Sequence, residues 1–258
     1  MNASASGREL TLLCTGPEQL VQARSPMGPP GHAGTVHVWL AELEGLRAEA
    51  DAFLPLLDAN ERERAKRFRF DHDRERFLIA HGVLRRVLGS WLARPPAEVE
   101  ILRGEHGKPY VEGHGLHFNL SDTKDAVIVA LQQDVPLGAD LETLERHTDH
   151  ANVARHYFAS GEVQDIEASN DPKRRFLELW TRKEAVLKAS GVGIMEDLRA
   201  LRADHARNTF QIAHPEFMRM AADLYHVRTF HWGAKHIISI ASPKAILDVQ
   251  AILFPGGL

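Results

Sequence analysis

The sequence has very little cysteine and no long apolar run. Cys14 is the only cysteine among the 258 residues, so an internal disulfide is excluded, and no Cys/His set has the spacing of a zinc site. No stretch approaches the 18 consecutive apolar residues of a membrane span, and the run Leu10–Cys14 is too short for the core of a signal peptide. These absences predict a protein of the reducing cytoplasm without a membrane partner.

Several common catalytic patterns are missing as well. The fifteen histidines include no H-E-x-x-H pair, which excludes the usual zinc protease motif. Gly191-Val192-Gly193 lacks the full glycine fingerprint of a dinucleotide site and is interpreted first as the end of a helix. No Ser-His-Asp order stands out. The sequence therefore gives no support to a metalloprotease, a dinucleotide-dependent enzyme or a serine hydrolase.

What the sequence does have is the composition of a globular protein and one local basic stretch. The 44% hydrophobic and 26% charged fractions provide material for one large domain or two ordinary ones. Between Glu61 and Arg86, nine basic and five acidic residues give a charge of +4, whereas the whole chain carries −4. Such a patch suits a small polyanion or an acidic protein partner better than nucleic acid. A solvated helix face with mixed charges explains the composition equally well.

The order of strand and helix signals predicts an α+β fold. Residues 1–34 are rich in Gly, Pro, Ala and Ser, which predicts a flexible leader. One helix is predicted from about Asp73 to Leu92; a second has Asp171 as N-cap and ends at Gly191. Strands are predicted at residues 35–40, 99–102, 116–120, 126–131, 137–142, 224–230 and 237–241.

The two predicted helices share a pattern. Arg76-Phe77-Leu78 followed by Val87-Leu88 has a counterpart in Arg175-Phe176-Leu177 followed by Val186-Leu187, at the same offset. Amphipathic helices in general share such patterns. The alternative is a chain of two similar halves with a ligand site between them.

Three short motifs carry candidate chemistry, each beside a simpler structural interpretation. Asp140 and Glu142 share one face of a predicted strand; they are either a wet strand face or a pair that needs a cation such as Mg²⁺. Glu184 and Lys188 lie four residues apart on a predicted helix. They form either a surface ion pair, or a site in which Glu184 binds the metal and Lys188 contacts a phosphate. Lys108, in the loop Gly107-Lys108-Pro109, and Ser121, at a strand end, are candidate anion contacts.

In this order, the motifs GKP, FNLS, GADLE and WTRKEAVLKASGVG resemble those of the Sfp-type phosphopantetheinyl transferases. The resemblance runs from about residue 36 to 241. It implies an α+β pseudo-dimer of two similar halves, each a small antiparallel sheet packed on a long helix. The halves would span residues 35–134 and 135–258, with coenzyme A in the cleft between them. It further implies a monomeric enzyme that transfers phosphopantetheine from coenzyme A to a serine of an acyl or peptidyl carrier protein, leaving 3′,5′-ADP.

Carried over by motif, the resemblance also implies roles for individual residues. Asp140, Glu142 and Glu184 would hold Mg²⁺, and Glu184 would take the serine proton directly or through a metal-bound water. Lys188 would contact the phosphates. Further coenzyme A contacts would come from Lys108, Ser121, Arg64 and Arg76.

The chain departs from the family at one position. Where the family has a histidine that meets the 3′-phosphate of coenzyme A, this chain has Asp122. An ionised aspartate repels a phosphate. We therefore expect Asp122 to point away and Lys124, in the same turn, to supply the missing positive charge.

Two other functions use the same residues. A Mg²⁺-dependent coenzyme A pyrophosphatase would need the same carboxylates but would use water as the nucleophile. An inactive carrier-binding homologue would keep the fold and lose the chemistry, and the presence of Asp140, Glu142 and Glu184 argues against it. The sequence does not indicate which carrier protein or pathway the enzyme serves.

Overall fold

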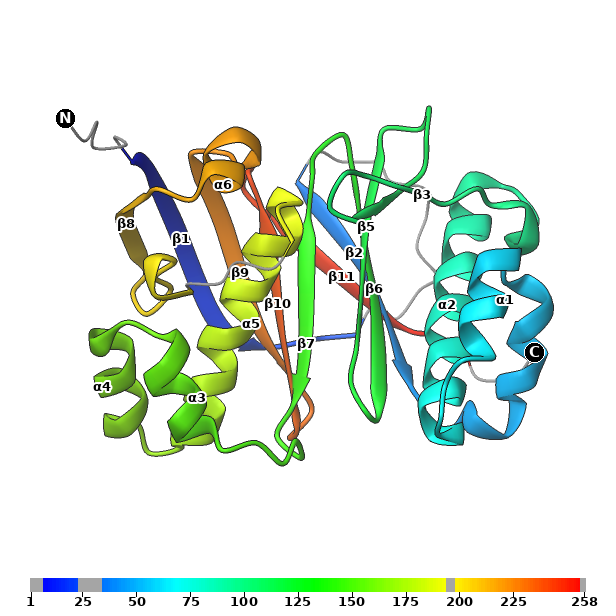
Figure 1. Ribbon diagram of the computed structural model, residues 1–258, viewed down its shortest axis with the longest axis horizontal. Helices are drawn as coiled ribbons and strands as arrows, with labels where there is room; N and C mark the ends of the chain where they lie inside the picture. Colours follow the sequence, from blue (N-terminus) through cyan, green and yellow to red (C-terminus); the bar gives the residue numbers. More distant parts are fainter. Residues whose placement is uncertain (1–6, 23–33, 194–197, 256–258) are drawn as a thin grey trace.

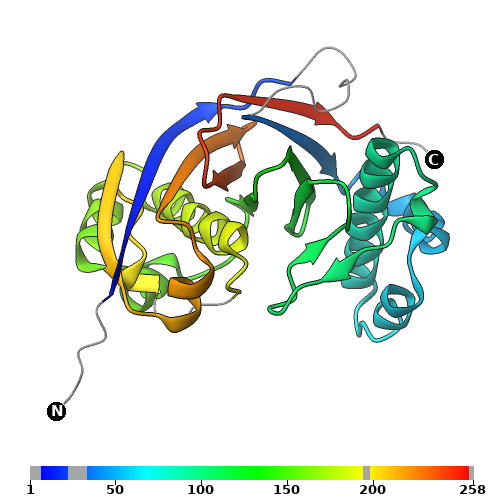
Figure 2. The same cartoon turned by 90° about the horizontal axis from the view of Figure 1, so that it is seen from above.

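The computed structural model describes residues 7–22, 34–193 and 198–255. It confirms an α+β fold in which two β-sheets lie face to face and each packs its other face on one long helix. Figures 1 and 2 show the two long helices on opposite sides of the paired sheets. Among the described residues, no helix combines the length and hydropathy that crossing a bilayer requires.

The first sheet belongs mainly to the N-terminal half of the chain. Its strand order is β11-β2-β6-β5, with β11 Asp248–Leu253, β2 Thr35–Glu42, β6 Ala126–Gln133 and β5 Leu116–Asp122. It packs on α2, Asp71–Leu92, through a core that includes Phe118, Val127 and Val129 from the sheet and Val83, Val87 and Leu88 from the helix. The predicted strands at 35–40, 116–120 and 126–131 and the predicted helix are confirmed.

The second sheet belongs mainly to the C-terminal half. Its order is β7-β10-β9-β1-β8, with β7 Gly138–Thr143, β10 His236–Ser242, β9 Leu224–Trp232, β1 Arg8–Gln19 and β8 Arg207–Ile212. It packs on α5, Pro172–Ser190. As predicted, the Asp171 side chain accepts a hydrogen bond from the Arg174 amide, and Gly191 ends the helix at φ 76°. A left-handed residue at this position favours glycine.

The two halves repeat the same arrangement. The strands β2-β6-β5 and β7-β10-β9 follow the same order, with antiparallel pairs, and each group is interrupted by its long helix after the first strand. Side chains along a strand point alternately to its two faces, and this places each sheet between the other sheet and its helix. On β2, Val36, Val38 and Leu40 face the other sheet, whereas Ala41 faces α2. The prediction of two similar halves is therefore confirmed.

The ends of the chain cross between the halves, which the sequence interpretation missed. β1 lies between β8 and β9 of the second sheet, and β11 lies against β2 of the first. The prediction of a leader outside the fold is therefore wrong for Arg8–Gln19, while residues 1–6 and 23–33 lie outside the described residues. Because β11 joins the first sheet, the second half does not extend as one unit to residue 258.

Both crossing strands run parallel to a neighbour, β1 with β9 and β11 with β2. The sheets are thus mixed rather than purely antiparallel.

The prediction of a strand at 99–102 is also wrong in large part. Pro96–Glu98, just before it, forms a short 3₁₀ turn, and only Leu102–Arg103 pairs, with Pro109–Tyr110. The remaining elements are η1 Arg47–Leu56, α1 Ala59–Ala65, η2 Pro96–Glu98, β3 Leu102–Arg103, β4 Pro109–Tyr110, α3 His150–Tyr157, α4 Ser160–Ala168, η3 Leu198–Ala200 and α6 Pro215–Met220.

Candidate active site in the cleft between the halves

Two of the motifs meet where strands β5 and β7 lie side by side. These strands do not form a backbone ladder with each other; instead, β5 side chains accept hydrogen bonds from the β7 backbone. Asn119 Oδ1 accepts from the Ala139 amide at 2.9 Å, and Ser121 Oγ accepts from the Leu141 amide at 3.1 Å. Both side chains are buried. The motif FNLS therefore joins the two halves directly beside the motif GADLE.

Gly138 brings the third motif to the same place. A Cβ atom at this glycine would lie 2.1 Å from the Ala185 carbonyl oxygen and 2.3 Å from the Ala189 amide nitrogen, both backbone atoms of α5. Only glycine permits so close an approach of strand and helix. As a result, Asp140, two residues further along β7, lies beside Glu184 and Lys188 of α5.

Lys188 joins the three motifs through its ammonium group. Lys188 Nζ donates to Asp140 Oδ1 at 2.6 Å, to Ser121 Oγ at 3.0 Å and to the Ala139 carbonyl at 3.2 Å. Ser121 Oγ in turn donates to Asp140 Oδ1 at 3.0 Å. The Lys188 side chain is 28% exposed and the Asp140 side chain 9%. The structure thus does not pair Lys188 with Glu184 on the protein surface.

Of the three predicted metal-binding carboxylates, Asp140 and Glu142 are buried and Glu184 is half-buried. Burial and, second, the nearby Asp140 raise the pKa of Glu142 to about 7 and that of Glu184 to about 7. Arg146 forms an ion pair with Glu142. Asp140 Oδ2 is buried and has no hydrogen-bond partner among the described residues. Asp140 Oδ2 is thus a buried carboxylate oxygen without a partner, near two carboxyl groups whose pKa is raised.

The carboxylates are not in coordinating contact with one another. Among the described residues, the one set of His, Cys, Asp and Glu ligand atoms lying within 4.8 Å of one another is Glu105, His106 and Glu216. Mutual repulsion keeps like charges apart, and Lys188 and Arg146 neutralise one carboxylate each. The carboxylate oxygens present, with the unpartnered Oδ2 of Asp140, are ligands of the kind that Mg²⁺ prefers.

Lys108 crosses the cleft from the loop between β3 and β4. Its ammonium donates to the carbonyls of Leu137 and Ala189, each at 3.0 Å. Burial lowers the pKa of Lys108 to about 8. The side chain lines a hollow of about 300 Å³ that also contains Glu184, Lys188 and Gly191. A second, mainly apolar hollow of about 280 Å³ lies on the other side of Lys108, with Tyr110 and Phe118 in its wall.

Three predicted basic contacts have partners outside the junction of Ser121, Asp140 and Lys188. Arg76 Nε pairs with Asp122 at 3.0 Å, and the guanidinium of Arg64 lies 5.0 Å from the centroid of the Phe77 ring. Lys124 instead pairs with Glu145 at 3.2 Å. Burial raises the pKa of Asp122, and Arg76 opposes that shift most strongly. Arg76, rather than Lys124, is thus the basic group paired with the position where the family has histidine.

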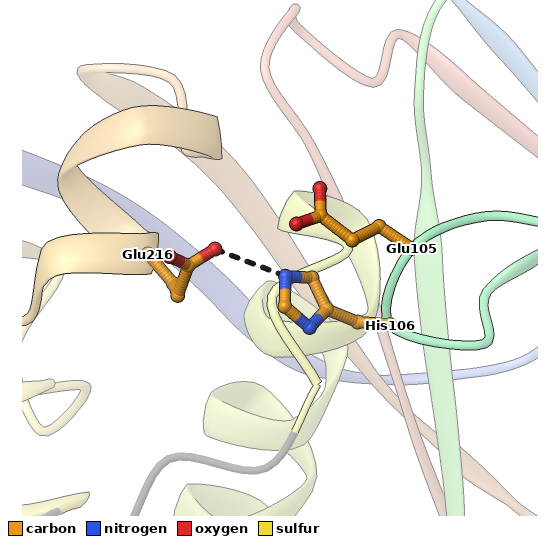
Figure 3. Close-up of side chains that lie close together, drawn as sticks. All are labelled: Glu105, His106 and Glu216. Atoms are coloured by element: carbon orange, nitrogen blue, oxygen red, sulfur yellow. Dashed lines mark hydrogen bonds and ion pairs between the residues drawn. The ribbon is translucent and has the colours of Figure 1, made fainter.

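The side chains of Glu105, His106 and Glu216 lie close together (Figure 3), and Glu105 and His106 also line the second, mainly apolar hollow. His106 Nε2 and Glu216 Oε2 lie 3.0 Å apart, and Arg219 donates to Glu105 at 2.9 Å and also to Glu216. These contacts link the β3–β4 loop with α6. Arg219 pairs with both carboxylates and His106 contacts Glu216, so the cluster forms an ionic bridge between the two segments.

Sequence reasoning missed the residues that support the site. Arg146 pairs with Glu142 from four positions beyond it, outside any motif. Asn119 belongs to a quoted motif, yet its contact with the Ala139 amide depends on a neighbouring strand.

Two family models match the chain. The model described as 4′-phosphopantetheinyl transferase superfamily matches residues 136–241, and that described as 4′-phosphopantetheinyl transferase, N-terminal, matches residues 44–134. The 4′-phosphopantetheinyl transferase HetI of Nostoc is 33% identical over 165 residues, which cover 62% of this chain and 70% of that protein. A putative 4′-phosphopantetheinyl transferase of Synechocystis is 30% identical over 179 residues, 67% and 72% of the two chains. The transferase Sfp of Bacillus subtilis is 26% identical over 149 residues, 57% and 65%.

Proposed function

Because the chain belongs to the 4′-phosphopantetheinyl transferase superfamily, we propose that it transfers the 4′-phosphopantetheine arm of coenzyme A to a serine of an apo carrier protein. The observation that carries the proposal is the junction of Ser121, Asp140 and Lys188, one residue from each of three motifs, beside the hollow that Glu184 lines. Acidic groups for a cation and a lysine for a phosphate are what a diphosphate substrate requires.

The reaction forms one phosphorus–oxygen bond and breaks another. The serine oxygen attacks the phosphorus that bears pantetheine, the bond to the second phosphate breaks, and 3′,5′-ADP leaves with the bonding electrons. The serine proton passes to Glu184, which lines the hollow, directly or through a water molecule. Such transfers depend chiefly on positioning and charge neutralisation.

The residues around the proton acceptor bind and orient the diphosphate. Asp140, Glu142 and Glu184 would hold Mg²⁺, which when bound supplies positive charge against the diphosphate. Lys188, beside Asp140, contributes an ammonium group to the same hollow. Lys108 holds Leu137 and Ala189 together across the cleft and so shapes its wall.

Both sides of this site come from one chain, because Lys108 and Ser121 belong to the N-terminal half and Glu184 and Lys188 to the C-terminal half. This supports a monomeric enzyme. The single buried cysteine is consistent with a protein of the cytoplasm.

The direct test is intact-mass analysis of several apo carrier proteins after incubation with coenzyme A and Mg²⁺. Transfer adds the mass of the phosphopantetheine arm to the carrier and depends on its serine. A chelator in place of Mg²⁺ should stop the reaction. Consumption of coenzyme A without a carrier would instead indicate a pyrophosphatase, and no product with any carrier would contradict the proposal.

Replacement of Lys188 by methionine should slow transfer by about 100-fold, because a charge-assisted contact to a phosphate in a half-buried hollow is lost. Because the buried Asp140 then lacks its counter-ion, the melting temperature should also fall, so the rate is measured at a temperature at which the variant is folded. Steady-state kinetics and thermal unfolding of the same preparation check this. Lys173→Met, on the first turn of the same helix, is the matched control. A Lys188→Met enzyme with the wild-type rate would show that the lysine serves only the packing of α5 on β7.

Replacement of Arg76 by alanine should raise the KM for coenzyme A about tenfold and leave that for 3′-dephospho-coenzyme A almost unchanged. The reason is that Arg76 is paired with Asp122, the position at which the family contacts the 3′-phosphate, and one charge-assisted contact contributes roughly 1.4 kcal/mol or more. Lys124→Ala, measured in parallel, tests the competing assignment. Equal effects of Arg76→Ala on both substrates would exclude a contact with the 3′-phosphate.

A further inference from the structure

A fully buried ion pair lies directly behind the candidate site. Glu162, on α4, and Lys183, on α5, are both 0% exposed, and Lys183 Nζ lies 2.6 Å from Glu162 Oε2. Removing two charges from water is costly, and well-packed apolar residues of similar size often stabilise a fold as well or better. The pair therefore calls for an explanation other than stability.

The pair ties four segments of the chain together. Glu162 Oε2 also accepts from the Ala159 amide at 3.0 Å, and Glu162 Oε1 accepts from the Ala203 amide at 3.0 Å. Lys183 Nζ donates to the Leu198 carbonyl at 3.0 Å and lies 4.1 Å from the centroid of the Phe158 ring. The start of α4, the middle of α5 and both ends of segment 198–203 thus meet at two side chains.

Lys183 and Glu184 are consecutive residues on one helix, and consecutive side chains project about 100° apart. Lys183 projects toward α4 and segment 198–203, whereas Glu184 lines the hollow in the cleft. Any rotation of α5 about its axis that loosens Lys183 would carry Glu184 away from Asp140. The buried contact on one side therefore sets the orientation of the carboxylate on the other.

The Glu162–Lys183 pair also holds the segment that follows Gly191 and Gly193, two residues in the wall of the hollow. Gly191 and Gly193, just after α5, line the hollow, and the chain returns to α5 at segment 198–203. This return segment is held by the Glu162–Lys183 pair and by Arg182, whose Nη1 donates to the Ala203 carbonyl at 2.9 Å. The pair thus anchors the segment that continues from the wall.

We propose that Glu162 and Lys183 are positioning residues for the transfer reaction: together they fix the rotation of α5, and with it Glu184, and they anchor the segment that follows the wall formed by Gly191 and Gly193. Neither residue contacts the reacting atoms. This inference rests on the proposed function, because it assigns the pair to the reaction at Glu184.

The test separates positioning from stability with four proteins: the wild type, Lys183→Met, Glu162→Gln and the double variant. Either charge removed alone leaves its partner buried without a counter-ion, so Lys183→Met should lose most stability. The double variant has no unpaired charge and keeps similar shapes, and its melting temperature should return to within a few degrees of the wild type. Its kcat for transfer should nevertheless fall at least tenfold, with loss of amide-exchange protection at residues 198–203.

Asp165→Asn is the matched control. Asp165 pairs with Arg175 at 2.7 Å and so also joins α4 to α5, but it lies at the solvent-exposed end of that contact. This variant should keep the wild-type kcat whatever its melting temperature.

A double variant with wild-type melting temperature and wild-type kcat would overturn the proposal, because the pair would then serve folding alone. If the double variant does not fold, Glu162→Gln decides: an unchanged kcat in the folded fraction overturns the proposal, and a fall of at least tenfold supports it. Failure of the wild type to modify any carrier would refute the proposed function instead. The wild-type reaction therefore distinguishes the two failures.

Discussion

Asp140→Asn and Glu184→Gln are each expected to lower the rate of phosphopantetheine transfer by at least about 100-fold, or about 3 kcal/mol of transition-state stabilisation. Asp140 accepts from both Lys188 and Ser121 through one oxygen and presents the other without a partner. An asparagine at this position removes the charge that both a cation and Lys188 require. Glutamine at position 184 removes the proton acceptor.

These variants should remain folded. Burial and Asp140 raise the pKa of Glu184 to about 7 in the folded state, above its ordinary value in an unfolded chain. The ionisation of Glu184 therefore destabilises the fold increasingly as the pH rises from the ordinary value through about 7. In the presence of a chelator, Glu184→Gln should match the wild type in acid and exceed its stability at pH 8.

Steady-state transfer at several Mg²⁺ concentrations, with thermal unfolding of the same samples, checks both statements. Glu167→Gln, an exposed carboxylate of α4 paired with Arg155, is the control for loss of one negative charge. Near-normal turnover of either site variant at limiting Mg²⁺ would show that the carboxylates do not bind the metal.

Deletion of residues 1–19 is expected to prevent stable folding. The deletion removes β1, an interior strand of the second sheet that pairs with β8 on one side and β9 on the other. Leu10, Leu12 and Cys14 of this strand are buried against α5 and its neighbours. Loss of three buried side chains at about 1.5–3 kcal/mol each, and of two strand pairings, is comparable with the 5–15 kcal/mol that stabilises a typical domain.

Point variants test the contribution of β1 to stability without truncating the chain. Leu12→Ala should cost about 2–5 kcal/mol of unfolding free energy, whereas Glu9→Ala, exposed on the same strand, should change it by no more than about 0.5 kcal/mol. Urea unfolding of each variant measures the difference. A truncated protein with the wild-type midpoint would show that β1 is dispensable.

How far the sequence predicts this protein differs from element to element. Helix α5 was predictable at both ends because its N-cap aspartate, its proline and its terminal glycine act on their own backbone. Strand β1 was not. Its apolar positions alternate at Leu10, Leu12 and Cys14, but a Gly- and Pro-rich segment follows, and its partners β8 and β9 lie about 200 residues away in the chain.

For the candidate site, too, the sequence indicated some contacts and only the structure showed others. The order of the motifs indicated that Ser121, Asp140, Glu184 and Lys188 belong to one site, and the structure brings Ser121, Asp140 and Lys188 into hydrogen-bond contact. Proximity in sequence suggested Lys124 as the residue that supplies the positive charge missing at Asp122. The structure pairs Asp122 with Arg76 of α2 instead, because the turn directs Lys124 toward Glu145 of the other half.

By itself, the sequence determined the α+β class and the ends of α5, because these depend on local periodicity and capping. The motifs and the family they resemble implied two similar halves and grouped Ser121, Asp140 and Lys188, which the structure brings into contact. Only the tertiary structure decided which ion pairs form, that β1 and β11 cross between the halves, and that Lys183 is buried against Glu162 while its neighbour Glu184 lines the cleft. These features depend on contacts between segments far apart in the chain, where the favourable partner is selected by burial and packing rather than by distance along the sequence.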